Sequence, residues 1–365
     1  MTPRWYVWLA IIAAVLALGV IVLGAYVRLS QAGLGCPDWP GCYGHISVPE
    51  SQTAVARADV RYVHRPVQAA RAWKEMTHRY SAGTLAVLIL ALAVAAWWLR
   101  FGTRRSVVEG AIEAPRAVAR AGPPVLLSSL TLLTVIFQAL LGMLTVTLLL
   151  FPPVVMGHLL GGYLTLALLV LLVLQSAGWL RAGERASRSL RWLAAATLVI
   201  LVLQVALGGW TSANYAGVAC PDFPTCQGQW APHMNFYAGF AWHGLGPNYQ
   251  GGILNDPARI AIHETHRLGA LLTFIMVVVT GLWFIIHARA RALKWLGALG
   301  IVLVIGQVSI GISMVHFALP LGLTDSHTGV AALLVATIVT WNWAVNAHAR
   351  DSSITSASVR VARLP

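Results

Sequence analysis

Charged residues are scarce in this chain of 365 residues, because Asp, Glu, Lys and Arg together make up only 10% of it. Soluble domains typically contain about 25% charged residues, which excludes a water-soluble enzyme of this size. Hydrophobic residues reach 58%, so a disordered or collagen-like chain is also excluded. Cysteine is nearly absent, with 4 residues, which excludes a small disulfide scaffold. The class that remains is a polytopic membrane protein.

Acidic residues are rarer than basic ones, with 12 Asp and Glu against 25 Lys and Arg and a formal net charge of +13. In a soluble protein such an excess suggests nucleic-acid binding. In a membrane protein it more often marks the basic loops that set orientation. We therefore expect the lipid bilayer, and no nucleic acid, as a partner.

Eight apolar stretches are long enough to cross a bilayer as helices. Residues 123–180 contain no charged side chain, and this run is too long for a single span. Pro152 and Pro153 divide it, because proline lacks the N–H group that a continuing helix needs. The sequence therefore predicts an all-α polytopic membrane protein with eight transmembrane helices, over residues 5–27, 77–99, 123–150, 154–180, 192–211, 260–286, 296–317 and 326–347.

The basic residues are unevenly divided between the two sides of these spans. The two termini and the loops on their side hold 16 Lys and Arg, whereas the other loops hold 6. The positive-inside rule then places the N and C termini in the cytoplasm and the remaining loops on the outer or periplasmic side of the cell (inner) membrane. All four cysteines fall in those outer loops, where disulfides persist.

Both cysteine pairs have the same C-x5-C spacing. Short rings close at a lower entropic cost than long ones, so we expect the disulfides Cys36–Cys42 and Cys220–Cys226. A cross-pairing between the loops requires the two halves of the protein to be close, and the sequence leaves that open.

The chain contains an internal duplication. Residues 33–44 align without a gap to residues 217–228 at an offset of 184, and Gly, Cys, Pro, Asp, Pro, Cys and Gly coincide. At an offset of 169, Gln138-x-x-x-Gly142 aligns with Gln307-x-x-x-Gly311, and His158 aligns with His327. We therefore predict two pseudo-symmetric four-helix bundles, at residues 1–180 and 181–365, related by an axis along the membrane normal.

Four histidines lie at the starts of the predicted even-numbered spans, two in each half: His78, His158, His266 and His327. We expect them within the first helical turns, near the outer face. A single histidine there is more often an interfacial group, but four at matching depth favour axial ligation of haem iron. Zinc and proton-relay interpretations are weaker, because carboxylates and free thiolates are too few.

One position differs between the halves. Glu75 precedes His78 by three residues, and His263 precedes His266 by three, so each faces the same side of its helix as the histidine that follows. A carboxylate beside a metalloporphyrin can act as a base or as a hydrogen-bond acceptor. Compensation of the helix dipole is the alternative for Glu75, but it does not explain the histidine in the other copy.

Arg79 and Arg267 directly follow two of the histidines. A guanidinium group there can bind a haem propionate through two hydrogen bonds or extend to the lipid headgroups. The sequence favours neither interpretation.

Taken together, these residues resemble the haem A synthase family over nearly the whole chain. The resemblance implies an oxidoreductase that converts the C8 methyl of haem O to a formyl group, giving haem A for cytochrome oxidase. It implies a resident haem b between His266 and His327, a substrate haem between His78 and His158, and a catalytic Glu75. Haem O synthase and cytochrome oxidase assembly factors are then candidate partners.

Two other functions fit the same ligands: a di-haem b cytochrome that exchanges electrons with quinol, and a haem carrier or assembly factor. Neither of these functions requires a carboxylate beside the iron of only one half. Glu75 is such a carboxylate, and it therefore favours the enzyme. No motif identifies the oxidant or the electron acceptor, and none assigns a role to His263 or to residues 229–258.

Overall fold

This computed structural model describes residues 2–108, 122–180, 187–242 and 244–361. Within these ranges the chain forms ten α-helices, one 3₁₀ helix and no strand. Eight of the helices are long and apolar enough to cross a membrane, which confirms the predicted fold class. They are α1 (Arg4–Leu29), α3 (Ala69–Val108), α4 (Val125–Thr147), α5 (Pro152–Ala177), α6 (Arg188–Ala213), α8 (Asp256–His287), α9 (Arg291–His316) and α10 (Leu321–Val361).

Three shorter helices lie between the long ones: α2 (Gln52–Arg61), η1 (Ala216–Val218) and α7 (Phe236–Phe240). Parts of two basic loops, residues 109–121 and 181–186, lie outside the described residues, as does the predicted boundary between residues 180 and 181. The predicted orientation in the membrane and the predicted division at that point stay predictions.

Most of the long helices begin earlier than their apolar stretches predict, by eight residues in α3 and by four or five in α6, α8, α9 and α10. Helix α3 begins at Ala69, nine residues before His78, and α8 begins at Asp256, ten residues before His266. The side chain of Asn255 accepts a hydrogen bond from the N–H of Ala258 at 3.2 Å and caps α8. The prediction that the histidines lie in the first turn was wrong, because hydropathy marks the apolar part of a helix and not its polar first turns.

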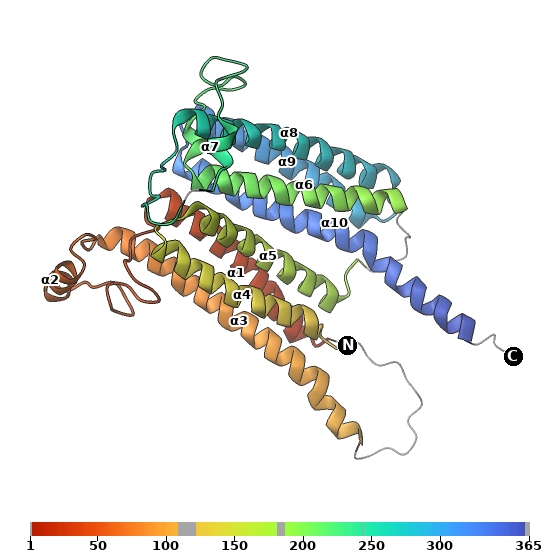
Figure 1. The fold of residues 1–365 in the computed structure, drawn as a ribbon. Helices are drawn as coiled ribbons and strands as arrows, with labels where there is room; N and C mark the ends of the chain where they lie inside the picture. The colour runs from red at the N-terminus through yellow and green to blue at the C-terminus, as the bar shows by residue number, and fades with distance from the viewer. Residues whose placement is uncertain (1, 109–121, 181–186, 243, 362–365) are drawn as a thin grey trace.

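The long helices pack as two neighbouring groups (Figure 1). Helices α1, α3, α4 and α5 contact one another, and so do α6, α8, α9 and α10. The groups meet where α1 and α5 pack against α10 and where α5 packs against α6. The hydroxyl of Tyr163 on α5 donates to the carbonyl of Thr328 on α10 at 3.1 Å, so polar contacts also cross this interface.

Small side chains allow these helices to approach closely. Ala10, Ala13 and Ala17 on α1 are almost completely buried. A Cβ on Gly281 of α8 would lie 2.9 Å from the carbonyl oxygen of Gly297 on α9. Apolar side chains are equally well solvated by lipid, so close packing of this kind is the main attraction between membrane helices.

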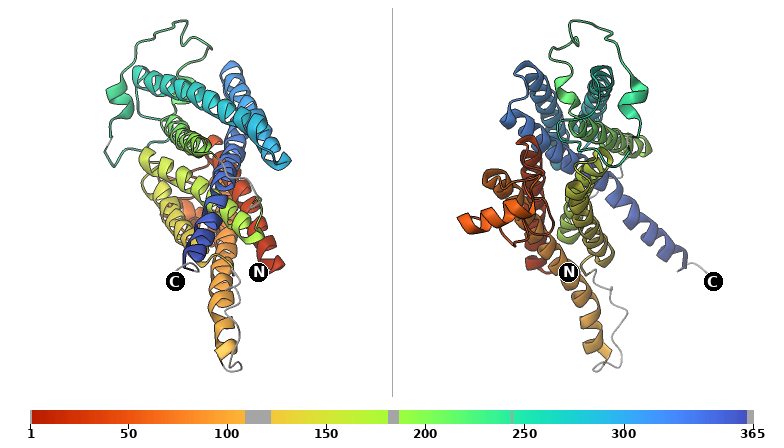
Figure 2. Two further views of the ribbon diagram at one scale, coloured as in Figure 1. Left: turned by 90° about the vertical axis from the view of Figure 1, so that its right-hand side faces the viewer. Right: turned by 60° about the vertical axis from the view of Figure 1, so that its left-hand side comes forward.

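The loops that carry the cysteines lie at one end of the bundle, which we call the disulfide end (Figure 1). Helix α1 begins and α10 ends at the opposite end. The segment that carries η1 and α7 covers the ends of α6 and α8 (Figure 2). From this segment Tyr249 extends to the first helix group, where its N–H donates to the carbonyl of Leu149 at 3.0 Å and its ring packs against Phe151.

Candidate functional site

Each of the four singled-out histidines faces a glycine on a neighbouring helix. An ideal Cβ on the glycine would lie only 2.9–3.2 Å from Cε1 of the imidazole. The imidazoles therefore occupy space that only a residue without a side chain leaves open. The four pairs are Gly24–His78, Gly142–His158, Gly208–His266 and Gly311–His327.

A glutamine lies one turn before three of these four glycines. Nε2 of Gln138 donates to the carbonyl of His158 at 2.7 Å. Nε2 of Gln204 lies 3.0 Å from both the carbonyl and Nδ1 of His266. In α9, Gln307 and Gly311 have the same spacing, whereas α1 has Val20 at the equivalent position. Gln204 and Gly208 were not predicted from the sequence, although Gln204-x-x-x-Gly208 repeats the motif found in the other two helices.

The imidazoles fit the requirements of haem ligation. All four histidines are half-buried. Nδ1 of His78, His158 and His327 is shielded from solvent without a hydrogen-bond partner among the described residues. A buried polar atom without a partner costs free energy, so these rings are suited to a partner that the chain itself does not supply. A neutral imidazole is the usual axial ligand of haem iron.

A zinc site receives no such support. The described ranges contain one cluster of three side chains with metal-ligating atoms, formed by Cys220, Cys226 and Glu264. Its two cysteines are joined in a disulfide. Zinc binds cysteine as the thiolate, so the cluster lacks two of its ligands in this oxidised form.

Glu75 is held in one orientation by contacts on both of its oxygens. Its side chain is buried, with only 4% of the residue exposed. Oε2 accepts a hydrogen bond from the N–H of Cys36 at 2.8 Å, and Oε1 forms an ion pair with Arg79. A carboxylate with both oxygens engaged has little rotational freedom, so Glu75 is fixed one helical turn from His78.

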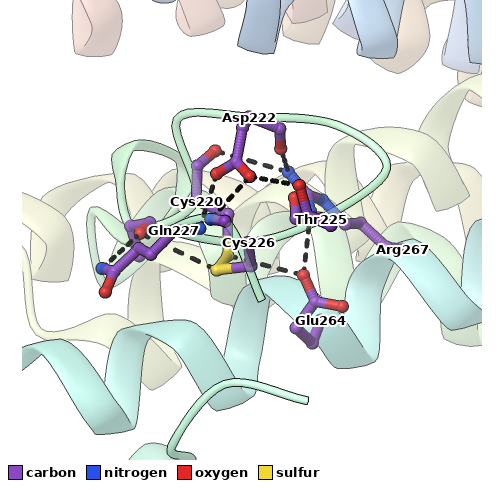
Figure 3. A network of polar contacts seen from close by, with 9 residues as sticks. Cys220, Asp222, Thr225, Cys226, Gln227, Glu264 and Arg267 are labelled. Carbon is purple, nitrogen blue, oxygen red and sulfur yellow. Dashed lines mark hydrogen bonds and ion pairs between the residues drawn. A yellow bond between two sulfur atoms is a disulfide. The ribbon is translucent and has the colours of Figure 1, made fainter. Parts of the chain in front are cut away.

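In the C-terminal half, the carboxylate lies one residue later in the sequence than in the N-terminal half. His263 occupies the place of Glu75 and is buried. The counter-ion of Arg267 is instead Glu264, whose Oε1 lies 2.9 Å from Nη1 of that arginine (Figure 3). The same oxygen lies 3.4 Å from Sγ of Cys220. Glu264 therefore faces the disulfide. An ion pair between a glutamate and an arginine is present in both halves, but the two residues are four apart in the first half and three apart in the second.

Arg79 and Arg267 tie the cysteine loops to the helices. Nη1 of Arg79 donates to the carbonyl of Asp38 at 2.9 Å and to that of Gly41. Arg267 donates to the carbonyls of Asp222 at 2.6 Å and Thr225 at 3.0 Å (Figure 3). The accepting residues are 184 apart in each case. The propionate contacts of these arginines stay a prediction, and the structure shows that their terminal nitrogens already bind loop carbonyls and a glutamate.

Each cysteine loop is a compact turn closed by a disulfide. Cys36 bonds to Cys42 and Cys220 to Cys226. Within the first loop, the carboxylate of Asp38 accepts the N–H groups of residues 43 and 44 at 2.7 and 2.6 Å. In the second loop, hydrogen bonds from the Thr225 hydroxyl and from the N–H groups of residues 228 and 227 lower the pKa of Asp222. The two loops are therefore built alike, down to the positive φ of the residue after each second cysteine.

A family model described as "Cytochrome oxidase assembly protein" (COX15-CtaA) matches residues 7–339. The chain belongs to this family. Among the curated proteins that it resembles, "Heme A synthase" of Shewanella oneidensis is 40% identical over 338 residues, which cover 92% of this chain and 95% of the relative. "Heme A synthase" of Caulobacter sp. (strain K31) is 26% identical over 93% of this chain and 95% of the relative, and that of Halalkalibacterium halodurans is 24% identical over 87% and 90%.

Proposed function

We propose that this protein is a haem A synthase, which oxidises the C8 methyl of haem O to a formyl group and so supplies haem A for cytochrome oxidase. The family assignment and the names of its relatives support this proposal. The observation that carries it within the structure is the difference between otherwise matching halves. Both halves have two histidines facing glycines, but only the first has a buried carboxylate, Glu75, one turn before its first histidine.

His266 and His327 are the proposed axial ligands of a resident haem b, and His78 and His158 those of the substrate haem. The glutamines support this division, because groups that hold a ligating imidazole strengthen a metal site. In the second half, both histidines face a helix with the Gln-x-x-x-Gly motif, whereas the helix that His78 faces has Val20 in place of the glutamine before Gly24. A substrate must enter and leave, and a less constrained ligand suits that requirement.

Glu75 is the proposed catalytic residue. When bound, haem would supply the electron-transfer chemistry that the oxidation of a methyl to a formyl group requires, in two successive two-electron steps. The chain's own contribution is a fixed carboxylate, which the Cys36 N–H and Arg79 hold in place. That carboxylate can accept a proton or bind a hydroxyl group at the substrate carbon.

The proposed location is the cell (inner) membrane, with the disulfide end on the periplasmic side. The uneven distribution of Lys and Arg supports this orientation. Eight apolar helices support a multi-pass protein, and such a bundle suits a substrate that carries a long isoprenoid tail. Haem O synthase and cytochrome oxidase assembly factors are the proposed protein partners, in keeping with the description of the family.

Pigment extraction tests this function directly. Cells that express the protein and are supplied with haem O should contain haem A, identified by chromatography and by the mass of the formyl porphyrin. Cells that carry the empty vector should contain haem O alone. If the protein binds haem and the haem O is recovered unchanged, the protein is a di-haem cytochrome or a haem carrier, and the proposal is wrong.

Gly24→Ala should lower haem A production severalfold. The added Cβ would lie 2.9 Å from Cε1 of His78, a distance at which the imidazole must move. The matched control is Gly19→Ala on the same helix, where nothing lies within 4 Å of the added Cβ. The control should keep full production and unfold at the same or a slightly higher temperature, since alanine favours helix more than glycine does. Equal production by the two variants would contradict the assigned position of His78.

Cys36→Ser/Cys42→Ser should lower thermal stability and retain haem A production. The ring that this disulfide closes is short, so its loss should cost about 2 kcal/mol of unfolding free energy. Asp38 and Arg79 still hold the loop through hydrogen bonds. Thermal unfolding and product yield are compared with those of Cys220→Ser/Cys226→Ser. Loss of all product with an unchanged unfolding temperature would show an obligatory thiol relay instead of a structural role.

A further inference from the structure

Arg28 lies in the last turn of α1, and the hydrogen-bonding capacity of its guanidinium group is only partly used. Its Nη2 donates to the carbonyl of Ser212 at 2.7 Å, and its Nε lies 3.4 Å from the hydroxyl oxygen of the same residue. Its Cζ lies 4.8 Å from the centre of the Tyr215 ring. Nη1 is shielded from solvent and has no hydrogen-bond partner in the part of the chain that the structure describes.

The charge of Arg28 is also uncompensated. The ion pairs among the described residues number three, Arg79–Glu75, Arg259–Asp256 and Arg267–Glu264, and Arg28 belongs to none of them. A guanidinium group that is shielded from water costs free energy unless an anion accompanies it. Its carbonyl and aromatic contacts offset part of that cost, but they leave the positive charge and one N–H group available to an anionic ligand.

The position of Arg28 indicates which anion this is. Arg28 follows Gly24 by one helical turn on the same face of α1, and Gly24 faces the imidazole of His78. Ser212 follows Gly208 in the same way on α6, and Gly208 faces His266. Residues 28 and 212 are also 184 apart, so their contact joins equivalent positions of the two halves. In both halves, the contact between Arg28 and Ser212 therefore lies one helical turn closer to the disulfide end than the glycine that faces a proposed haem ligand.

We propose that Arg28 binds a propionate carboxylate of bound haem. The inference rests on the proposed function, because it assumes haem at the histidines. A guanidinium group binds a carboxylate through two parallel hydrogen bonds, which a lysine cannot reproduce. Arg79 and Arg267, the other arginines beside the histidines, already bind loop carbonyls and glutamates. The propionate comes from the haem of either the first or the second half. Variants that each lack one histidine of one half, described below, distinguish these two sources.

The test compares two forms of one pigment. Full-length protein, expressed in cells that cannot make haem and purified in detergent, is titrated with haem b and with its dimethyl ester, which has the same iron and ring without the negative charges. Wild-type protein should bind the free acid roughly ten- to a hundred-fold more tightly, as expected for one charge-assisted hydrogen-bonded pair. Arg28→Met should bind both forms with the same affinity. Arg4→Met, an exposed arginine at the other end of α1, should keep the wild-type preference.

Two further variants complete the test. Arg28→Gln, which removes the charge but can still donate to Ser212, replaces Arg28→Met if that variant does not fold, and it should also lose the preference. Titrations of His327→Ala and His158→Ala, each with and without the Arg28 change, identify the half whose haem is bound, since each background retains the intact histidine pair of one half.

The outcomes separate the two claims. If wild-type protein binds neither form, the proposed function fails, and the role of Arg28 with it. If wild-type protein binds both forms equally, or if the charge-free variants keep the preference in both histidine backgrounds, the role of Arg28 is wrong and haem binding stands.

Discussion

His266→Ala and His327→Ala are each expected to abolish the low-spin b-type spectrum of the resident haem. Each imidazole supplies one of the two axial bonds in the proposed site, so the loss of either leaves the iron without a bis-histidine environment. The surrounding contacts support this expectation, because Gly208 and Gly311 leave room for these rings and Gln204 contacts His266. The measurement is the reduced-minus-oxidised optical spectrum of purified protein, with the low-temperature EPR signal of the ferric form.

The control for this pair is His316→Ala, which removes an exposed histidine at the end of α9 in the same half. It should leave the spectrum of the resident haem unchanged. An unaltered bis-histidine spectrum in both His266→Ala and His327→Ala would contradict the assignment of the resident site.

Glu75→Gln is expected to retain the resident haem and to yield no haem A. Glutamine is nearly isosteric and still accepts a hydrogen bond from the Cys36 N–H, but it carries no charge for Arg79 and accepts no proton. The expected loss is at least a hundred-fold in product, the lower end of the usual contribution of a general acid–base group. Product is measured by porphyrin mass after incubation with haem O, and the resident haem by its optical spectrum.

Glu264→Gln is the matched control for Glu75. It removes the carboxylate that pairs with the equivalent arginine, Arg267, in the other half. If loss of the ion pair alone disturbs the protein, both variants lose stability and activity together. Full activity of Glu75→Gln would exclude a role for the ionised carboxylate and would leave only the hydrogen-bonding role.

The fold was accessible from the sequence because its main signals are local. Runs of apolar residues mark the eight spans, and Pro152 lies at the first position of α5, where a proline is tolerated. The starts of α3 and α8 were placed too late, since their first turns contain polar residues that a hydropathy pattern does not distinguish from a loop. Asn255, a residue typical of helix N-caps, marks the true start of α8 in the sequence, but the prediction followed the apolar pattern instead.

The candidate site was only partly accessible. The duplicated motifs identified the four histidines and the asymmetry at Glu75, because those features are visible as letters at a fixed offset. The glycines that face the imidazoles and the contact of Arg28 with Ser212 depend on how each helix is rotated toward its neighbour. Such rotation is set by packing between helices, and one sequence does not specify it. Glu264 was likewise missed as the partner of Arg267, since its spacing differs from that of Glu75.

The most direct test of two histidine-held haem sites is an experimental density map of the full-length protein prepared with haem O. We expect one tetrapyrrole with its iron between His266 and His327, and a second, bearing the isoprenoid tail, between His78 and His158 on the side of Glu75. A map in which the tailed haem lies in the second half, or in which the iron is bound by residues other than these histidines, would contradict this expectation.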